Sequence, residues 1–329
     1  MRCQRSFQEI RKTFSRRVGV FLVVSTEESP SERARRLVTA VLIINRLTAT
    51  FGYNLAYFLV GVAIAFPTVP AASLDVVAWF GIGVMLAKMQ ASVADAIHDR
   101  AVDSINPAKS SIAWSVDIIG QNRAWSLLVA EIVSAMFAFS VVAVRTDDQL
   151  FFLLGAAFTL LGFVYSYPPR LKERGVVNHV VTTGVDVCFV VLPVPYLLIG
   201  TFTTRTLVIG AVVALYSFAY HVVHQAADVY YDRQQGIASY ARSLGAPQSL
   251  ALAAVLTATA GAVAVASGYY LAALVLLAVT VHYASLCRRV RGRPLRRQSE
   301  IVSSGFNIAW VATALNVATG VSVLLGSGI

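Results

Sequence analysis

Long apolar runs, separated by short polar stretches, make up most of the chain after residue 45. Each run is close to the roughly 20 residues that a helix needs to cross the hydrocarbon core of a bilayer. The runs are continuous and do not alternate between apolar and polar residues, which favours helices over the strands of a membrane barrel. The pattern predicts an all-α, polytopic membrane protein with nine transmembrane helices, at about 46–67, 72–94, 124–144, 149–167, 178–200, 206–227, 248–267, 269–287 and 303–326.

The basic residues between these runs predict the orientation of the helices. The first 36 residues hold nine Lys or Arg, and six arginines follow the eighth run, whereas the loops at the other end offer only Arg145 and Arg205. Positively charged loops are retained in the cytoplasm. We therefore expect a cytoplasmic N-terminus, with the loops 95–123 and 228–247 on that same side of the membrane.

The composition supports a membrane protein and bounds its organisation. The chain of 329 residues is 57% hydrophobic and only 13% charged, with a mean hydropathy of +0.67. A soluble protein of this length needs more charge to cover its surface. The net charge of +10 follows the alternating loops, which favours topology control over binding of nucleic acid. We expect a basic cytoplasmic arm over 1–45, lying free or at the membrane interface, and one nine-helix domain over 46–329.

Two groups of aspartates stand at the ends of apolar runs and predict a metal site. Asp95, Asp99 and Asp103 recur at every fourth position, so a helix would carry them on one face; Asp228 and Asp232 have the same spacing. Carboxylates at a membrane boundary are costly unless they serve a purpose. Mg²⁺ is commonly held by one or two carboxylates together with substrate phosphates. The five acids could hold such ions around a diphosphate and promote cleavage of a carbon–oxygen bond, or they could be solvated and paired with nearby arginines.

Basic and aromatic residues near these acids extend the predicted site. Arg170 and Lys172 follow a Pro-Pro pair in a short loop, where they could bind phosphate oxygens or merely set the topology. Tyr165 and Tyr220 are candidates to stabilise a carbocation through their ring faces, although most boundary tyrosines form an interfacial belt. The histidines near the acids favour packing roles, but any of them could act as a base: His98, His221 and His224.

These segments together resemble the UbiA superfamily of intramembrane prenyltransferases. The resemblance is carried by Asp99-Arg-Ala-Val-Asp103-Ser-Ile-Asn106, Tyr165-Ser-Tyr-Pro-Pro-Arg-Leu-Lys172 and Asp228-Val-Tyr-Tyr-Asp232-Arg-Gln-Gln-Gly236. It implies a UbiA-like bundle of nine helices with a cytoplasmic-side active site and Mg²⁺ as the cofactor. The implied substrate is an isoprenyl diphosphate, whose prenyl group lies in a tunnel open to membrane lipid and is transferred to a lipophilic acceptor. The implied metal ligands are Asp99, Asp103, Asp228, Asp232 and Asp95, and Arg170 and Lys172 would hold the diphosphate.

The chain departs from the family's pattern in ways that leave alternatives open. In the family's first motif, NDxxDxxxD, Asp95 stands where Asn is usual and Ala96 where the first Asp is usual. Gln225 replaces the leading acid of the longer second motif. The alternatives are a UbiA-type terpene cyclase that needs no acceptor, a transporter and an inactive homologue. The content of Ala, Val and Arg is typical of a GC-rich bacterial source, which predicts a bacterial plasma membrane.

Overall fold

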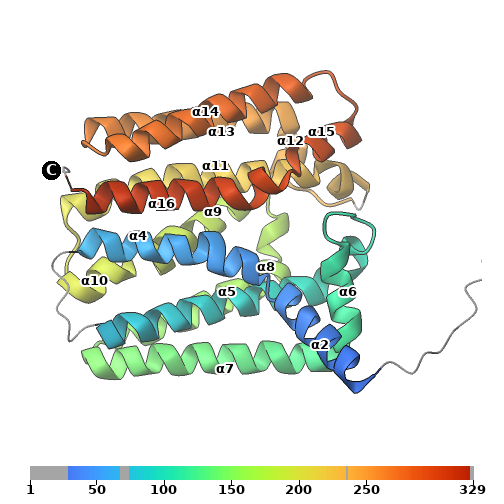
Figure 1. Cartoon of the computed structure of the whole chain (residues 1–329), viewed down its shortest axis with the longest axis horizontal. Coiled ribbons are helices and arrows are strands. Elements are labelled where there is room, and N and C mark those ends of the chain that lie inside the picture. The colour runs from blue at the N-terminus through green and yellow to red at the C-terminus, as the bar shows by residue number, and fades with distance from the viewer. Residues whose placement is uncertain (1–28, 67–73, 235, 327–329) are drawn as a thin grey trace, which may run out of the picture. The chain divides into compact units, whose positions relative to one another are not determined.

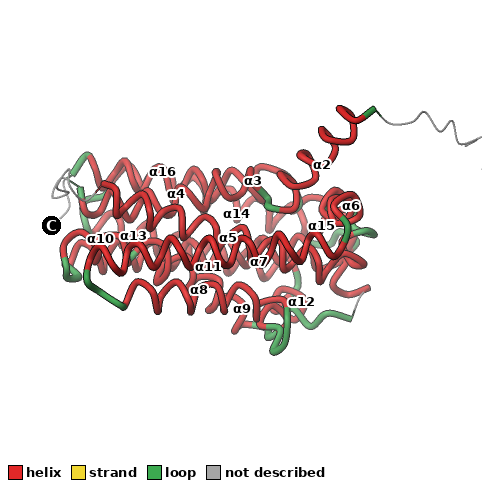
Figure 2. Tube along the Cα trace, turned by 90° about the horizontal axis from the view of Figure 1, so that it is seen from below, coloured by secondary structure: helices red, strands yellow, loops and turns green. Residues whose placement is uncertain are grey.

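We describe a computed structural model of the chain, which covers residues 29–66, 74–234 and 236–326. Throughout these residues the chain forms helices and loops (Figure 2). It divides into two compact units, 1–39 and 40–329. Most of the predicted arm over 1–45 lies outside the described residues, and its limits stay a prediction. The described part of the arm is helix α2, Pro30–Ile44, which crosses the boundary between the units.

The second unit contains all nine predicted spans. Eight are long and apolar enough to cross a membrane, and the ninth, α8, is an apolar helix of 17 residues. The prediction of an all-α membrane protein is therefore confirmed, and the chain is an integral membrane protein. Two spans are built from three segments each: α3 (Leu47–Ala49), η1 (Thr50–Asn54) and α4 (Leu55–Ala65); then α9 (Val176–Gly184), η4 (Val185–Val191) and α10 (Pro193–Ile199). The others are α5 (Leu74–Asp103), α7 (Gln121–Thr146), α8 (Leu150–Ser166), α11 (Thr204–Gln234), α13 (Ala246–Ala266), α14 (Tyr270–Val290), and η5 (Phe306–Trp310) with α16 (Val311–Leu324).

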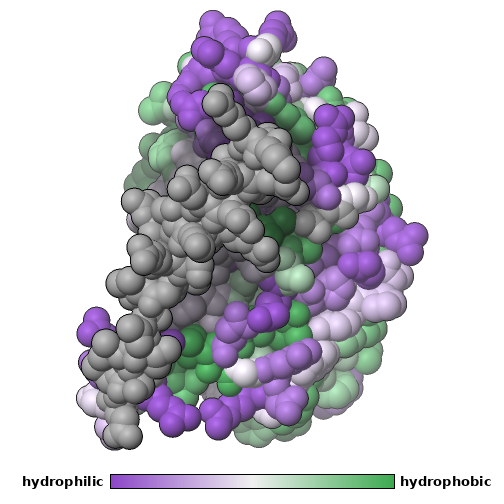
Figure 3. All heavy atoms as spheres, turned by 90° about the vertical axis from the view of Figure 1, so that its right-hand side faces the viewer, coloured by the Kyte–Doolittle hydropathy of each residue, from purple (hydrophilic) through white to green (hydrophobic). Residues whose placement is uncertain are grey.

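Three short helices between the spans lie at one end of the bundle. The long helices run side by side in Figure 1, and α6 (Ser110–Ile119), α12 (Tyr240–Leu244) and α15 (Leu295–Val302) lie at its right-hand end. The C-terminal ends of α5 and α11 point to the same end. Hydrophilic side chains gather among the described residues when this end is viewed directly (Figure 3). The two aspartate groups are thus on one side of the bundle, as the sequence predicts.

Small residues allow the spans to approach one another closely. A Cβ atom on Gly155 of α8 would lie 2.3 Å from the ring of Phe139, and one on Gly61 of α4 would lie 2.5 Å from the carbonyl oxygen of Val191. Lipid is as apolar as the side chains, so association of spans depends on close packing more than on the hydrophobic effect. These glycines permit the contacts that hold α8 against α7, and α4 against η4.

Candidate active site

The C-terminal parts of α5 and α11 face a shared cavity of about 180 Å³, which we call the acid cavity. Its lining includes Asp95 and Asp99 from α5 and Asp228 and Asp232 from α11. Four residues are slightly more than one helical turn, so the two acids of each pair lie on the same face. Asp103, one turn beyond Asp99, is buried but does not line the cavity. The structure therefore brings together four of the five predicted metal ligands around one space.

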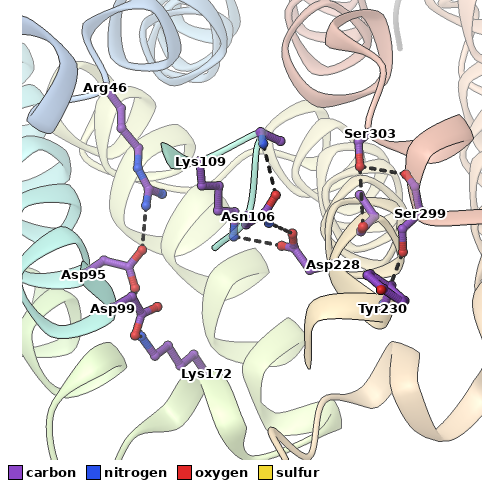
Figure 4. Close-up of polar contacts among 12 residues, drawn as sticks. Arg46, Asp95, Asp99, Asn106, Lys109, Lys172, Asp228, Tyr230, Ser299 and Ser303 are labelled. Atoms are coloured by element: carbon purple, nitrogen blue, oxygen red, sulfur yellow. Dashed lines mark hydrogen bonds and ion pairs between the residues drawn. The ribbon is translucent and has the colours of Figure 1, made fainter. Parts of the chain in front are cut away.

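Basic side chains pair with three of these acids, Asp95, Asp99 and Asp228 (Figure 4). Arg46 Nη2 donates to Asp95 Oδ2 at 2.6 Å. Lys172 Nζ lies 3.0 Å from Asp95 Oδ1 and 2.6 Å from Asp99 Oδ1. Lys109 Nζ lies 2.9 Å from Asp228 Oδ2. Buried charges are costly without partners, so these ion pairs compensate the acids in the structure as it stands.

The two lysines keep their charge in this setting. Burial alone would lower the pKa of Lys172, but Asp95 and Asp99 outweigh burial and raise that pKa above its usual value. Burial likewise opposes the charge of Lys109, and Asp228 raises the pKa of that ammonium. The acid cavity thus contains fixed positive charges as well as carboxylates, which suits an anion that binds through both a metal and ammonium groups.

A second cavity of about 190 Å³, which we call the apolar cavity, adjoins the first. Its lining includes Tyr53, Phe158, Leu161, Val181 and Tyr220. An anion in the acid cavity and a hydrocarbon chain in the apolar cavity could therefore belong to one amphipathic ligand. The residues that line both cavities are Arg46, Asp95, Tyr165, Thr182, His221 and His224.

Both predicted tyrosines reach these cavities. Tyr165 lines the two cavities where they meet, and Tyr220 lines the apolar one. The hydroxyl of Tyr220 donates to the carbonyl oxygen of Ile308, and its ring centroid lies 5.4 Å from that of Tyr53. The hydroxyl of Tyr220 is therefore engaged, while its ring remains part of the cavity wall. Their predicted role in stabilising a cation stays a prediction.

The predicted phosphate ligands are placed differently from each other. Lys172 lines the acid cavity, whereas Arg170 pairs with Glu173 at 2.8 Å and is not part of the lining of either cavity. Contact of Arg170 with a diphosphate stays a prediction.

The sequence did not identify Arg46 and Lys109 as site residues, because basic residues that flank spans are explained equally well by the orientation of the protein.

The sequence also did not identify two charged residues inside the spans as part of the site. Lys88 of α5 and Asp186 of η4 line the apolar cavity and lie 2.7 Å apart. The signal was present, because an ionisable residue inside an apolar run is by default a candidate functional residue. The predicted spans 72–94 and 178–200 contain them, but no sequence pattern linked the two.

The acids have the ligand atoms that magnesium prefers, but their positions in this structure do not form a metal site. Within the described ranges, no three His, Cys, Asp or Glu side chains lie close enough together to hold a metal ion. Carboxylate oxygens are nevertheless the ligands that Mg²⁺ prefers. Asp103 Oδ2 is buried and has no hydrogen-bond partner among the residues that the structure describes. This oxygen could accept a cation, whereas Asp99 and Asp228 are paired with Lys172 and Lys109.

The structure is a helical membrane bundle with acids and bases around one cavity and a largely apolar cavity beside it. The family model described as the UbiA prenyltransferase family matches residues 54–323. The chain therefore belongs to the UbiA prenyltransferase family and is a prenyltransferase-type enzyme. This membership favours the enzyme over the transporter among the alternatives that the sequence left open.

Solved structures share the fold at low sequence identity. A UbiA homologue from Archaeoglobus fulgidus bound to GPP and Mg²⁺ has a TM-score of 0.63 and 18% identity, covering 87% of this chain and 100% of that one. A structure described as digeranylgeranylglyceryl phosphate synthase has a TM-score of 0.58 and 14% identity, covering 90% and 100%. The apo UbiA homologue from Aeropyrum pernix K1 has a TM-score of 0.57 and 18% identity, covering 83% and 96%. Comparison with curated proteins gives no match.

Proposed function

We propose that the protein is a magnesium-dependent prenyltransferase that ionises an allylic isoprenyl diphosphate and transfers the prenyl group to a lipophilic acceptor. The observation that carries the proposal is the junction of the two cavities. One offers carboxylates and cations to a diphosphate, and the other offers apolar and aromatic walls to a prenyl chain. The binding of GPP and Mg²⁺ by the Archaeoglobus homologue supports the same pairing of ligands.

The acids and bases divide the work at the diphosphate end. Asp99, Asp103, Asp228 and Asp232 would hold Mg²⁺, which supplies positive charge that favours departure of the diphosphate when bound. Lys109 would turn from Asp228, and Lys172 from Asp99, to donate to diphosphate oxygens, while Lys172 keeps its contact with Asp95. Each ammonium has three N–H donors, so it can bind an anion without losing all of its protein contacts.

Asp95 has a different role in this proposal. Its two oxygens accept from Arg46, Lys172 and Ser166, the last at 2.8 Å. A carboxylate with this many donors is better suited to position cations than to bind a metal ion. We propose that Asp95 holds Arg46 and Lys172 in reach of the diphosphate, in place of the direct metal contact that the motif predicts.

The apolar cavity would control the cation that remains after ionisation. Its hydrocarbon and aromatic walls would limit access of the water that could otherwise capture the cation. The ring faces of Tyr165 and Tyr220 would stabilise the positive charge by cation–π attraction. The acceptor would then form its bond to the prenyl carbon that carried the diphosphate.

Cyclisation without an acceptor is the second candidate, and the aromatic wall of the apolar cavity favours it. The tilted rings of Tyr53 and Tyr220 form part of this wall, where they could stabilise a positive charge during ring closure. We further propose that the end carrying the acid cavity faces the cytoplasm, on the basis of the basic loops at that end.

Incubation of the purified protein with Mg²⁺ and C10, C15 or C20 diphosphates, without an acceptor, tests the function. Release of pyrophosphate from at least one of them supports ionisation. A cyclic hydrocarbon or alcohol as the main product would replace transfer by cyclisation. Absence of pyrophosphate release with every chain length, with and without a lipid extract as a source of acceptors, would overturn both.

A further inference from the structure

The apolar cavity contains a network of three ionisable residues from three different spans. Asp186 Oδ1 accepts from Lys88 Nζ at 2.7 Å, and Asp186 Oδ2 pairs with His221 Nε2 at 2.8 Å. Ser217 Oγ also donates to Asp186 Oδ2 at 2.7 Å. The Asp186 side chain is only 1% exposed, so the carboxylate depends on these partners. We call Lys88, Asp186 and His221 the inner layer.

The inner layer lies directly below the acids along both helices. Lys88 precedes Asp95 by seven residues in α5, and His221 precedes Asp228 by seven residues in α11. Both helices are continuous through these positions. Seven residues are nearly two turns, so each pair shares a helix face with a separation of about 10 Å along the axis. Lys88 and Asp186 thus line only the apolar cavity, and His221 lies where the two cavities meet.

The surroundings of the inner layer indicate that these residues do more than stabilise the fold as an ion pair. Intramembrane charges are costly and commonly mark functional sites. In addition, three spans change to π-helix around this cavity, and π segments occur frequently at functional sites. Tyr53 of η1 and Asp186 of η4 line the cavity, and η5 reaches it through the hydrogen bond from Tyr220 to Ile308.

The network has the arrangement of an oriented base. A carboxylate that accepts from one imidazole nitrogen fixes the ring and leaves the other nitrogen with a lone pair. Here Nε2 of His221 faces Asp186, which leaves Nδ1 to accept a proton. Lys88 also pairs with Asp186, so the carboxylate has a cationic partner besides the imidazole. A proton taken by the imidazole would then be stabilised by the nearby carboxylate.

We propose that His221 is the base that takes the proton released when the prenyl cation is quenched, with Asp186 and Lys88 as positioning residues. The inference rests on the function proposed above. The carbon–oxygen bond breaks and its electron pair leaves with the diphosphate. In cyclisation a double bond of the chain then forms a new bond to the cationic carbon, and in transfer the acceptor does so. A C–H bond beside the cationic centre, or the acceptor's own C–H or O–H bond, breaks last; its electrons stay with the product and the proton passes to Nδ1 of His221.

Other groups in the cavities are less suited to this step. The oxygens of Asp95 accept from Arg46, Lys172 and Ser166, and those of Asp186 are taken within the inner layer. His224, almost one turn further along α11, is the main rival because it also lines both cavities. No hydrogen bond to a carboxylate orients His224 within the part of the chain that the structure describes.

The test is the ratio of olefin to prenyl alcohol formed for each pyrophosphate released. Purified protein is incubated with Mg²⁺ and geranyl or farnesyl diphosphate, without an acceptor, so that the cation either loses a proton or is captured by water. The products of His221→Gln are counted per pyrophosphate released, so that a change in its rate of ionisation does not alter the ratio. A general base contributes roughly 10²-fold or more, so the olefin-to-alcohol ratio should fall about 100-fold. The matched control is His282→Gln, since His282 pairs with Asn307 outside both cavities.

The possible outcomes separate this proposal from the general function. An unchanged olefin-to-alcohol ratio in His221→Gln would overturn the role of His221. The role would also be overturned if the ratio fell about 100-fold in His224→Gln but not in His221→Gln. Loss of pyrophosphate release in His221→Gln, with release retained in His282→Gln, would assign the residue to ionisation and also overturn it. If His221→Gln does not fold, the same ratio is measured for the double variant Lys88→Met with Asp186→Asn, which leaves the net charge unchanged. A tenfold or larger fall in the ratio supports the proposal, and an unchanged ratio overturns it. Absence of pyrophosphate release in the unchanged protein would contradict the proposed prenyltransferase or cyclase function, and the role of His221 would fall with it.

Discussion

Arg46 Nη2 and Asp95 Oδ2 lie 2.6 Å apart, although 49 residues separate them along the chain. Arg46 directly precedes the first span, and Asp95 lies near the C-terminal end of α5. The other oxygen of Asp95 lies 3.0 Å from Lys172, so one carboxylate joins cations from two loops. Asn is usual at this position of the motif, and a neutral amide would compensate neither charge. This contact explains why the chain carries an acid here.

Asp95→Asn is therefore expected to weaken diphosphate binding more than metal binding. The substitution removes the charge that holds Arg46 and Lys172, and hydrogen bonds to charged groups contribute about 1.5–3 kcal/mol. We expect KM for the allylic diphosphate to rise by about tenfold, measured by pyrophosphate release. The Mg²⁺ concentration for half-maximal activity should change by less than about twofold.

The matched control is Asp75→Asn, because Asp75 pairs with Arg145 at 3.4 Å on the exposed surface at the other end of the bundle. Exposed ion pairs contribute little, so neither constant should change. If Asp95→Asn instead needs much more Mg²⁺ and its KM for the diphosphate is unaltered, Asp95 is a metal ligand and the proposed positioning role is wrong.

Asp103→Asn tests the unpaired oxygen near the acid cavity. Asp103 Oδ2 is buried and lacks a hydrogen-bond partner among the described residues, so a cation would be its natural ligand. The substitution should raise the Mg²⁺ concentration for half-maximal pyrophosphate release by tenfold or more. Asp117→Asn is the control, because Asp117 pairs with Arg100 on the exposed surface of the same end. Equal Mg²⁺ requirements in the two variants would exclude Asp103 from the metal site.

Tyr220→Phe and Tyr220→Leu separate the ring from the hydroxyl. The hydroxyl donates to Ile308, whereas the ring forms part of the apolar cavity. If the ring face stabilises a cation, the phenylalanine variant should retain kcat within about fivefold, and the leucine variant should lose roughly tenfold or more. Equal losses in both variants would show that the hydrogen bond to η5 is what matters.

Gly155→Ala tests the close contact of α8 with α7. The new Cβ would lie 2.3 Å from the ring of Phe139, which is buried and has little room to move. Overpacking of this kind costs about 1–3 kcal/mol, so the midpoint of thermal unfolding in detergent should fall. A Cβ on Gly184 of α9 meets no atom within 4 Å, and Gly184→Ala should leave the midpoint unchanged or raise it. A similar midpoint for both alanine variants would contradict the packing argument.

The sequence predicted the membrane fold and part of the site for local reasons. Apolar runs of about 20 residues specify spans because the bilayer offers no other partner for the backbone. Helical periodicity placed Asp95 beside Asp99, and Asp228 beside Asp232, and the order of the spans placed both pairs at one end. Each of these inferences needs only residues that are near one another in the chain, or a count of the helices between them.

The tertiary structure alone decided which charges meet. Lys88 and Asp186 are 98 residues apart, and Arg46 and Asp95 are 49 apart. No periodicity within one helix predicts such pairs, because they depend on which helices pack together and on the rotation of each about its axis. The same packing paired Lys109 with Asp228 and left Arg170 outside the cavities. The sequence by itself thus determined the spans and the positions of the acids, and only the packing of the helices decided how those acids are compensated.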